Sequence, residues 1–243
     1  MDNHIYDKLR GFRLKTMADE YMRQDDVPGI TELTFDQRLG LLVDAEADAR
    51  DSARLKKRIK EAKFAEPGAA IESIRYYPDR KLNRELFTQL ATNRYIYQPK
   101  NVLIVGATGS GKSYLACALG NRACQENYKV RYIRLPDLFT ELEIGKLEHT
   151  YDKLLKRLHT RDLLIIDEWL LYPLTETQRQ SILEVIEGRY RHRATIICSQ
   201  YDPDGWHEIL GGGPIADAIM DRLKPKSETI HVGGKLSMRV RES

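Results

Sequence analysis

Apolar residues recur at helical spacing through the first third of the chain. This spacing predicts an amphipathic helix over residues 4–24, which a polar, proline-containing stretch ends. Thr34 and Gln37 then form the pattern of a capping box, in which each side chain binds the other residue's backbone at the start of a helix. A long helix is expected from there towards Phe64. Residues 1–70 are therefore predicted to form a small all-helical module.

Asp79 is expected to cap a further helix, which carries several leucines. From Asn101 onward the pattern of apolar residues changes. Short, continuous apolar runs now alternate with helical segments. Continuous runs are typical of a parallel sheet that helices cover on both faces, so residues 71–243 are predicted to form an α/β core. The five candidate strands are Asn101–Val105, Lys129–Arg134, Leu163–Asp167, Thr195–Ser199 and Thr229–Val232.

Charge is distributed unevenly along the chain. The 243 residues carry a net charge of +3, but Arg50 to Lys100 holds thirteen basic and six acidic residues. Such a run is most often the solvated face of a helix, and it also suits a surface that binds DNA phosphates. The basic residues expected to face DNA are those of residues 54–63 together with Arg75, Arg80, Lys81 and Arg84.

The cysteines and the apolar runs exclude several classes of protein. Cys117, Cys124 and Cys198 show no C-x-x-C spacing, so a structural metal site is not expected, and their odd number fits a reducing compartment. No apolar run approaches the length of a membrane span, and the first residues do not begin a signal peptide. We expect a cytoplasmic protein without a membrane partner.

Residues 106–113 read G-A-T-G-S-G-K-S, between an apolar strand-like run and a helical one. Strand, glycine loop and helix in this order predict a phosphate-binding loop, whose backbone amides and helix N-terminus attract the phosphates of a nucleoside triphosphate such as ATP. Lys112 is expected to reach the β and γ phosphates, and the Ser113 hydroxyl to bind Mg²⁺. The candidate nucleotide contacts are Gly106, Ala107, Thr108, Gly109, Ser110, Gly111, Lys112, Ser113 and Tyr114.

Two adjacent carboxylates, Asp167 and Glu168, stand at the end of the third candidate strand. Asp167 is expected to hold a water of the Mg²⁺ opposite Ser113, and Glu168 to polarise the attacking water. The alternative is an acidic turn that merely closes a core strand. An adjacent pair of this kind favours ATP hydrolysis over transfer to an organic acceptor, for which we find no binding groups. A metabolic kinase and a non-hydrolysing scaffold are therefore the weaker interpretations.

Polar residues after the fourth strand and near the C-terminus complete the candidate site. Ser199 or Gln200 could orient the attacking water, although both are also ordinary turn residues. Arg222 could stabilise charge on the transferred phosphoryl group, within its own subunit or from a neighbour, or simply form a surface ion pair. The arginines at 189, 191 and 193 could face DNA or a neighbouring subunit, or form a solvated helix end.

The order and spacing of five motifs resemble the IstB/DnaC group of AAA+ proteins. The motifs are NVLIVGATGSGKS, LLIIDE, GRYRHRATIICSQ, ADAIMDRL and GGKLSMR, and the resemblance covers residues 64–241. It implies a P-loop AAA+ core with a parallel sheet flanked by helices, preceded by the helical module. The stretch from Ser199 through Trp206 to Leu223 is more similar to IstB, the transposition helper, than to the helicase loader DnaC.

The resemblance also implies roles for single residues. Arg222 matches the arginine that family members insert into a neighbour's nucleotide site, and Arg239 matches the C-terminal arginine that senses the γ phosphate. It further implies a homo-oligomeric ATPase that assembles on duplex DNA, largely without sequence preference, and stimulates an IstA-like transposase. The alternative from the same resemblance is a DnaC-like loader that delivers a helicase to single-stranded DNA.

Overall fold

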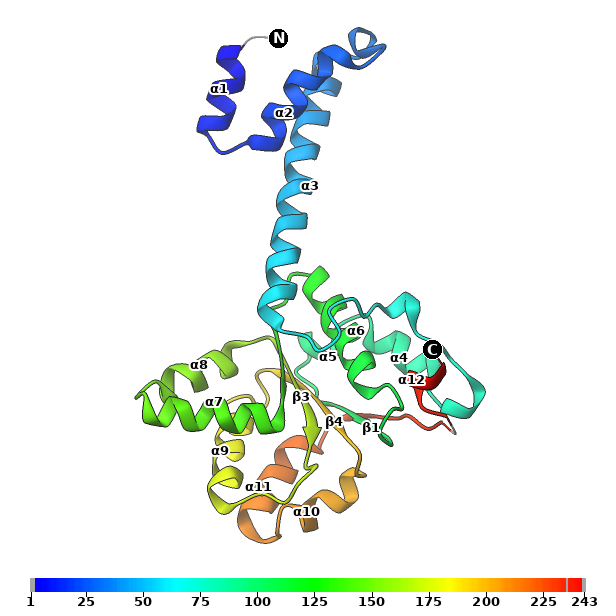
Figure 1. The fold of residues 1–243 in the computed structure, drawn as a ribbon, viewed down its shortest axis with the longest axis vertical. Coiled ribbons are helices and arrows are strands. Elements are labelled where there is room, and N and C mark those ends of the chain that lie inside the picture. Colours follow the sequence, from blue (N-terminus) through cyan, green and yellow to red (C-terminus); the bar gives the residue numbers. More distant parts are fainter. Residues whose placement is uncertain (1–2, 235, 242–243) are drawn as a thin grey trace. The chain divides into compact units, whose positions relative to one another are not determined.

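The computed structural model describes residues 3–234 and 236–241, and the chain divides into two compact units, residues 1–57 and 58–243 (Figure 1). The division falls inside one long helix, α3 (Phe35–Ala62). The domain boundary predicted at residue 70 stays a prediction. No helix of the described residues is long and apolar enough to span a membrane.

The first unit contains α1 (Asn3–Gly11), α2 (Lys15–Arg23) and the first part of α3. The single helix predicted over residues 4–24 is wrong, because the chain turns at Arg13, whose φ is +63°. An ion pair of 3.4 Å between Arg10 and Asp19 then joins the two short helices. Helical spacing alone cannot reveal a break that contains no proline. The capping box of Thr34 and Gln37 is confirmed by bonds of 2.8 and 3.2 Å.

The second unit is built on a five-stranded parallel sheet with the order β2-β3-β4-β1-β5. Its strands are β1 (Val102–Val105), β2 (Val130–Arg134), β3 (Leu163–Trp169), β4 (Ala194–Ser199) and β5 (Glu228–His231), so all five predicted strands are confirmed. Its helices are α4 (Arg84–Leu90), α5 (Arg94–Tyr97), α6 (Lys112–Gln125), α7 (Leu135–Leu147), α8 (Tyr151–Thr160), α9 (Glu176–Glu187), α10 (Trp206–Ile209), α11 (Gly213–Leu223) and α12 (Met238–Arg241).

Helices cover both faces of this sheet, as the continuous apolar strands predict. On one face, Leu103, Ile166 and Ile197 join a core with side chains of α7, α8, α9 and α11. On the other face, α6 packs so closely that a Cβ on Gly120 would lie 2.9 Å from Ile165 Cδ1. The sheet is thereby fixed from both sides, and its carboxyl-terminal edge carries the polar residues described below.

One predicted helix start is wrong. Asp79 lies in a 3₁₀ turn, Pro78–Arg80, and Asn83 instead caps α4 by accepting a bond of 3.0 Å from the amide of Leu86. Both residues are good N-caps by type, and the choice depends on the conformation of the chain between them. Lys81, in the left-handed region at φ +52°, separates the turn from the helix.

Candidate functional site

The glycine loop connects β1 to α6 at the carboxyl edge of the sheet, as predicted. Gly109 and Gly111 have φ values of +79° and +91°, a region that residues with a Cβ rarely adopt. These two residues turn the chain sharply into α6, which begins at Lys112. The first amides of a helix lack intrahelical partners, so Ser113 and Tyr114 lie where an anion is attracted.

Lys112 is folded back onto its own loop. Its Nζ donates hydrogen bonds of 2.6 Å to the Gly106 carbonyl and 2.9 Å to the Ala107 carbonyl. Burial lowers the pKa of Lys112, and the negative charge of Asp167 opposes this shift. The lysine is thus buried at the mouth of the loop, with carbonyl partners that phosphate oxygens can replace.

Arg80 contacts the glycine loop, a role that the sequence did not reveal. Its side chain is buried and donates a 2.9 Å bond to the Ser110 carbonyl and a 2.5 Å bond to the Arg75 carbonyl. Its expected role in contacting DNA is therefore wrong, because the guanidinium is not accessible. A cavity of 220 Å³ lies beside it, lined also by Lys112 and Met238.

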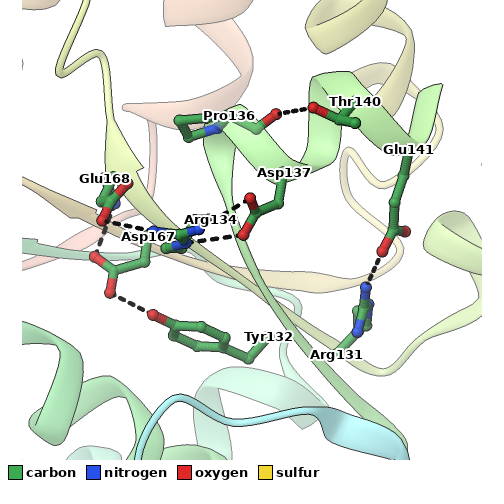
Figure 2. Close-up of polar contacts among 9 residues, drawn as sticks. All are labelled: Arg131, Tyr132, Arg134, Pro136, Asp137, Thr140, Glu141, Asp167 and Glu168. Atoms are coloured by element: carbon green, nitrogen blue, oxygen red, sulfur yellow. Dashed lines mark hydrogen bonds and ion pairs between the residues drawn. The ribbon is translucent and has the colours of Figure 1, made fainter. Parts of the chain in front are cut away.

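The two carboxylates of β3 are held by different partners (Figure 2). Asp167 is buried, and its Oδ2 accepts a 2.6 Å hydrogen bond from the Tyr132 hydroxyl, while its Oδ1 accepts one of 2.8 Å from the Glu168 amide. Burial and the neighbouring Asp167 both raise the pKa of Tyr132, which keeps its hydroxyl protonated as a donor. Asp167 is therefore fixed in position at the strand end.

Glu168 contacts a different residue of β2, Arg134. Its φ is +56°, and it lies where the pairing of β3 with β4 shifts register between Ile166 and Trp169. Its Oε1 lies 3.7 Å from Nη1 of Arg134, which also binds Asp137 through bonds of 2.8 and 3.0 Å (Figure 2). Strained, irregular backbone of this kind often re-aims a side chain at a functional site.

Ser199 lies between the glycine loop and β3, and its hydroxyl is bonded to backbone groups. Its hydroxyl donates a 3.0 Å bond to the Trp169 carbonyl and accepts one of 3.1 Å from the Tyr201 amide, and its carbonyl accepts the Gly106 amide at 3.1 Å. Gln200, the next residue, is exposed. Ser199 thus ties three strand ends together, and Gln200 has the freer side chain of the two candidates.

Arg222 lies near the amino-terminal ends of the strands, opposite the end that carries the glycine loop. Its carbonyl accepts a 3.1 Å bond from Asn101, the residue before β1, and its guanidinium pairs with Glu187. The glycine loop follows the other end of β1, about 16 Å away at 3.3 Å per residue. Arg222 and the glycine loop of the same chain are therefore not brought together.

The neighbouring arginines differ from one another. Arg189 is buried and donates a 2.9 Å bond to the Arg161 carbonyl, so it holds chain segments together and cannot face DNA. Burial lowers its pKa. Arg191 and Arg193 are exposed beside Arg222. Arg239 belongs to α12, but its side chain lies outside the described part of the structure.

Among the described residues, no group of three or more His, Cys, Asp or Glu side chains could hold a metal ion by itself. Mg²⁺ does not require one, since it commonly binds one or two protein oxygens together with phosphates and waters. The Ser113 hydroxyl and the Asp167 carboxylate are hard oxygen donors of this kind. Their chemistry fits Mg²⁺ held jointly with a nucleotide.

Comparison with known proteins points to one family. The family model of the "IstB-like ATP binding protein" matches residues 7–243. An insertion-sequence ATP-binding protein of Sinorhizobium fredii is 36% identical over 234 residues, which cover 96% of this chain and 94% of that protein. The ATP-binding protein of insertion sequence IS1162 from Pseudomonas fluorescens is 38% identical over 200 residues, or 82% and 87% of the two chains.

Solved structures share the fold of about two thirds of the chain. The DnaC helicase loader gives a TM-score of 0.53 at 21% identity and covers 67% of this chain and 96% of that one. DnaA from Aquifex aeolicus bound to AMPPCP gives a TM-score of 0.58 at 20% identity, over 68% and 50% of the two chains. At such identities the likeness shows the fold alone, which is that of an AAA+ core.

Proposed function

Because this chain belongs to the IstB-like ATP-binding proteins of insertion sequences, we propose that it hydrolyses ATP as an oligomer assembled on duplex DNA. On that DNA it would recruit or stimulate a cognate, IstA-like transposase in the cytoplasm. ATP binding is common to the family, and the complete glycine loop is in place for it. ATP hydrolysis, Mg²⁺ binding, assembly on DNA and the interaction with a transposase are what we propose beyond ATP binding.

Hydrolysis rests on four side chains at the carboxyl edge of the sheet. Lys112 would exchange its carbonyl partners for the β and γ phosphates, whose negative charge stabilises the buried ammonium. Ser113 and Asp167 would hold Mg²⁺, which neutralises charge on the phosphates. Glu168 would polarise the attacking water once its carboxylate leaves Arg134, since an ion-paired carboxylate is a weaker base.

The location of Arg222 is the observation that carries the oligomeric part of the proposal. The arginine lies at the amino-terminal edge of the sheet, whereas the nucleotide loop lies at the carboxyl-terminal edge. An arginine so placed can complete a nucleotide site only in another subunit. Its ion pair with Glu187 would be exchanged for the phosphates of that neighbour.

The basic residues of α3 support DNA binding. Lys56, Lys57 and Lys60 of α3 are exposed, as is Lys63 directly after the helix, and α3 carries no base-reading motif that we recognise. Lysines on a solvated helix contact phosphates and so confer affinity without sequence preference. A DnaC-like loader remains the second candidate on the AAA+ fold, and a preference for single-stranded DNA would distinguish it.

A mixing experiment tests the shared site. Lys112→Ala should lose ATP binding, and Arg222→Ala should bind ATP but hydrolyse it slowly. Each variant supplies what the other lacks, so their mixture should recover part of the wild-type turnover. Lys224→Ala, which removes an exposed ion pair to Asp204 near the same helix end, is the matched control and should retain turnover. Absence of recovery in proteins shown to co-assemble would contradict a role for Arg222 across subunits.

A further inference from the structure

The chain after β5 returns over the glycine loop and lies against it. Val232 donates a 2.7 Å bond to the Val105 carbonyl, Gly233 one of 2.7 Å to the Arg80 carbonyl, and Met238 one of 2.8 Å to the Gly109 carbonyl. We call the described residues between 232 and 241 the C-terminal strap. The strap therefore contacts the residue before the nucleotide loop and the middle of the loop.

Two residues of the strap lie on the loop glycines. A Cβ on Gly109 would collide with the Ser237 side chain, and one on Gly111 would lie 3.5 Å from Met238 Cγ. Met238 also lines the 220 Å³ cavity with Lys112 and Ser113. The strap is thus one wall of the space beside the phosphate loop.

One side chain anchors the end of the strap. The Arg241 guanidinium pairs with the Asp79 carboxylate and lies 4.5 Å from the centre of the Tyr77 ring. The side chains of Arg241 and Asp79 are 15% and 26% exposed, so water weakens this pair less than a fully solvated one. Figure 1 shows α12 beside the segment that precedes α4, where both partners lie.

The anchor and the phosphate loop share a support. Asp79 and Arg80 are neighbours in the 3₁₀ turn Pro78–Arg80, and Arg80 binds the Ser110 carbonyl of the loop. The turn consequently holds the strap through one residue and the loop through the next. A nucleotide bound at the loop would lie against a wall whose position depends on Arg241.

We propose that Arg241, through Asp79 and Tyr77, is a positioning residue that keeps the C-terminal strap against the phosphate loop and slows the departure of bound nucleotide. This inference rests on nucleotide binding at the loop. It predicts that freeing the strap removes one wall of the site while leaving the loop, Lys112 and the carboxylates of β3 intact. Nucleotide should then bind more weakly because it leaves faster.

The test measures the release of methylanthraniloyl-ADP, a fluorescent ADP, from the full chain by stopped flow. Arg241→Ala should raise the dissociation rate about tenfold, as expected for loss of a partly buried ion pair and a cation–π contact, and Asp79→Asn, which removes the ion pair alone, should raise it by a smaller factor. Arg241→Lys keeps the charge but not the planar stacking, and its dissociation rate should lie between those of the wild type and Arg241→Ala. Lys100→Ala, which removes a half-buried pair to Glu228, should release ADP at the wild-type rate.

A charge exchange keeps the test independent of folding. The double variant Asp79→Arg/Arg241→Asp should release ADP more slowly than either of its single substitutions, and thermal unfolding without nucleotide reports any general loss of stability. Dissociation rates within twofold of wild type in folded Arg241→Ala would overturn the proposal, as would a charge exchange that restores nothing. Failure of the wild-type chain to bind the probe would instead count against the nucleotide site itself.

Discussion

Tyr132 and Arg134 show how two positions of one strand can control the chemistry of the next strand. They lie two residues apart on β2, so their side chains leave the same face of the sheet. The Tyr132 hydroxyl donates a hydrogen bond to Asp167, and the Arg134 guanidinium lies near Glu168. The proposed metal ligand and the proposed base are thereby kept apart, although they are adjacent in sequence.

Removing the Tyr132 hydroxyl tests the first of these contacts. In Tyr132→Phe, Asp167 loses a buried donor and is free to turn, so Mg²⁺ should be held less firmly. We expect the Mg²⁺ concentration at half-maximal ATP hydrolysis to rise several-fold and turnover to fall about tenfold, consistent with about 1.5–3 kcal/mol for a hydrogen bond to a charged group. Tyr97→Phe alters an exposed tyrosine and is the control. An unchanged Mg²⁺ dependence would contradict the assigned role of Tyr132.

Replacing Glu168 by Gln keeps the size of the side chain and removes its basicity. ATP should still bind, while turnover should fall by about two orders of magnitude or more, as for a lost general base. Glu143 lines a cavity of 180 Å³ together with Glu168, and Glu143→Gln should leave turnover unchanged. Both quantities are measured with radiolabelled ATP, by filter binding and by phosphate release. Near-wild-type turnover in Glu168→Gln would assign the base to another group.

At the scale of elements, the tight contact between α6 and the sheet depends on one glycine. A Cβ on Gly120 would lie 2.5 Å from Phe64 Cε1 and 2.9 Å from Ile165 Cδ1. Gly120→Ala gains helix propensity, but it overpacks this contact, and overpacking costs typically about 1–3 kcal/mol. We expect a net loss of stability in urea unfolding. A Cβ added at Gly205 would meet no atom within 4 Å, so Gly205→Ala should unfold like wild type. Equal or greater stability of Gly120→Ala would show that Phe64 and Ile165 yield at little cost.

The elements that could be predicted from the sequence are those with local signals. Buried parallel strands are continuous apolar runs, and the glycine loop, the capping box and the acidic pair near the end of β3 each have a recognisable local pattern. Arg80 and Tyr132 have no such signal. Their partners, Ser110 and Asp167, lie 30 and 35 residues away, and only the folded chain brings them together.

The same limit explains the errors. A run of arginines at 189, 191 and 193 reads as one basic patch, yet Arg189 is buried on backbone carbonyls while the other two are exposed. A burial difference between residues two positions apart depends on how α9 meets β4. The sequence shows where the charged residues are, but not which of them are exposed to solvent.

At the scale of the whole molecule, the proposed DNA surface and the nucleotide site use different residues. The exposed lysines of α3 precede the glycine loop by about 50 residues and belong to none of the nucleotide motifs. Neutralising Lys56, Lys57 and Arg58 together should consequently leave ATP hydrolysis without DNA nearly unchanged. The same substitutions should weaken binding to all duplex sequences alike, because phosphates carry no sequence information.

Salt dependence tests whether α3 contacts DNA phosphates, and the preference for duplex or single-stranded DNA separates this proposal from a helicase loader. The logarithm of duplex affinity should fall linearly with the logarithm of salt concentration, with a slope near −0.9 for each phosphate neutralised. The triple variant should flatten that slope by about two to three units, one for each charge removed. Fluorescence anisotropy with duplex and single-stranded DNA of the same sequence measures both the slope and the preference. Because a transposition helper acts on intact target DNA, we expect duplex to bind more tightly. A clear preference for the single strand would favour the loader, and an unchanged slope in the triple variant would move the DNA surface away from α3.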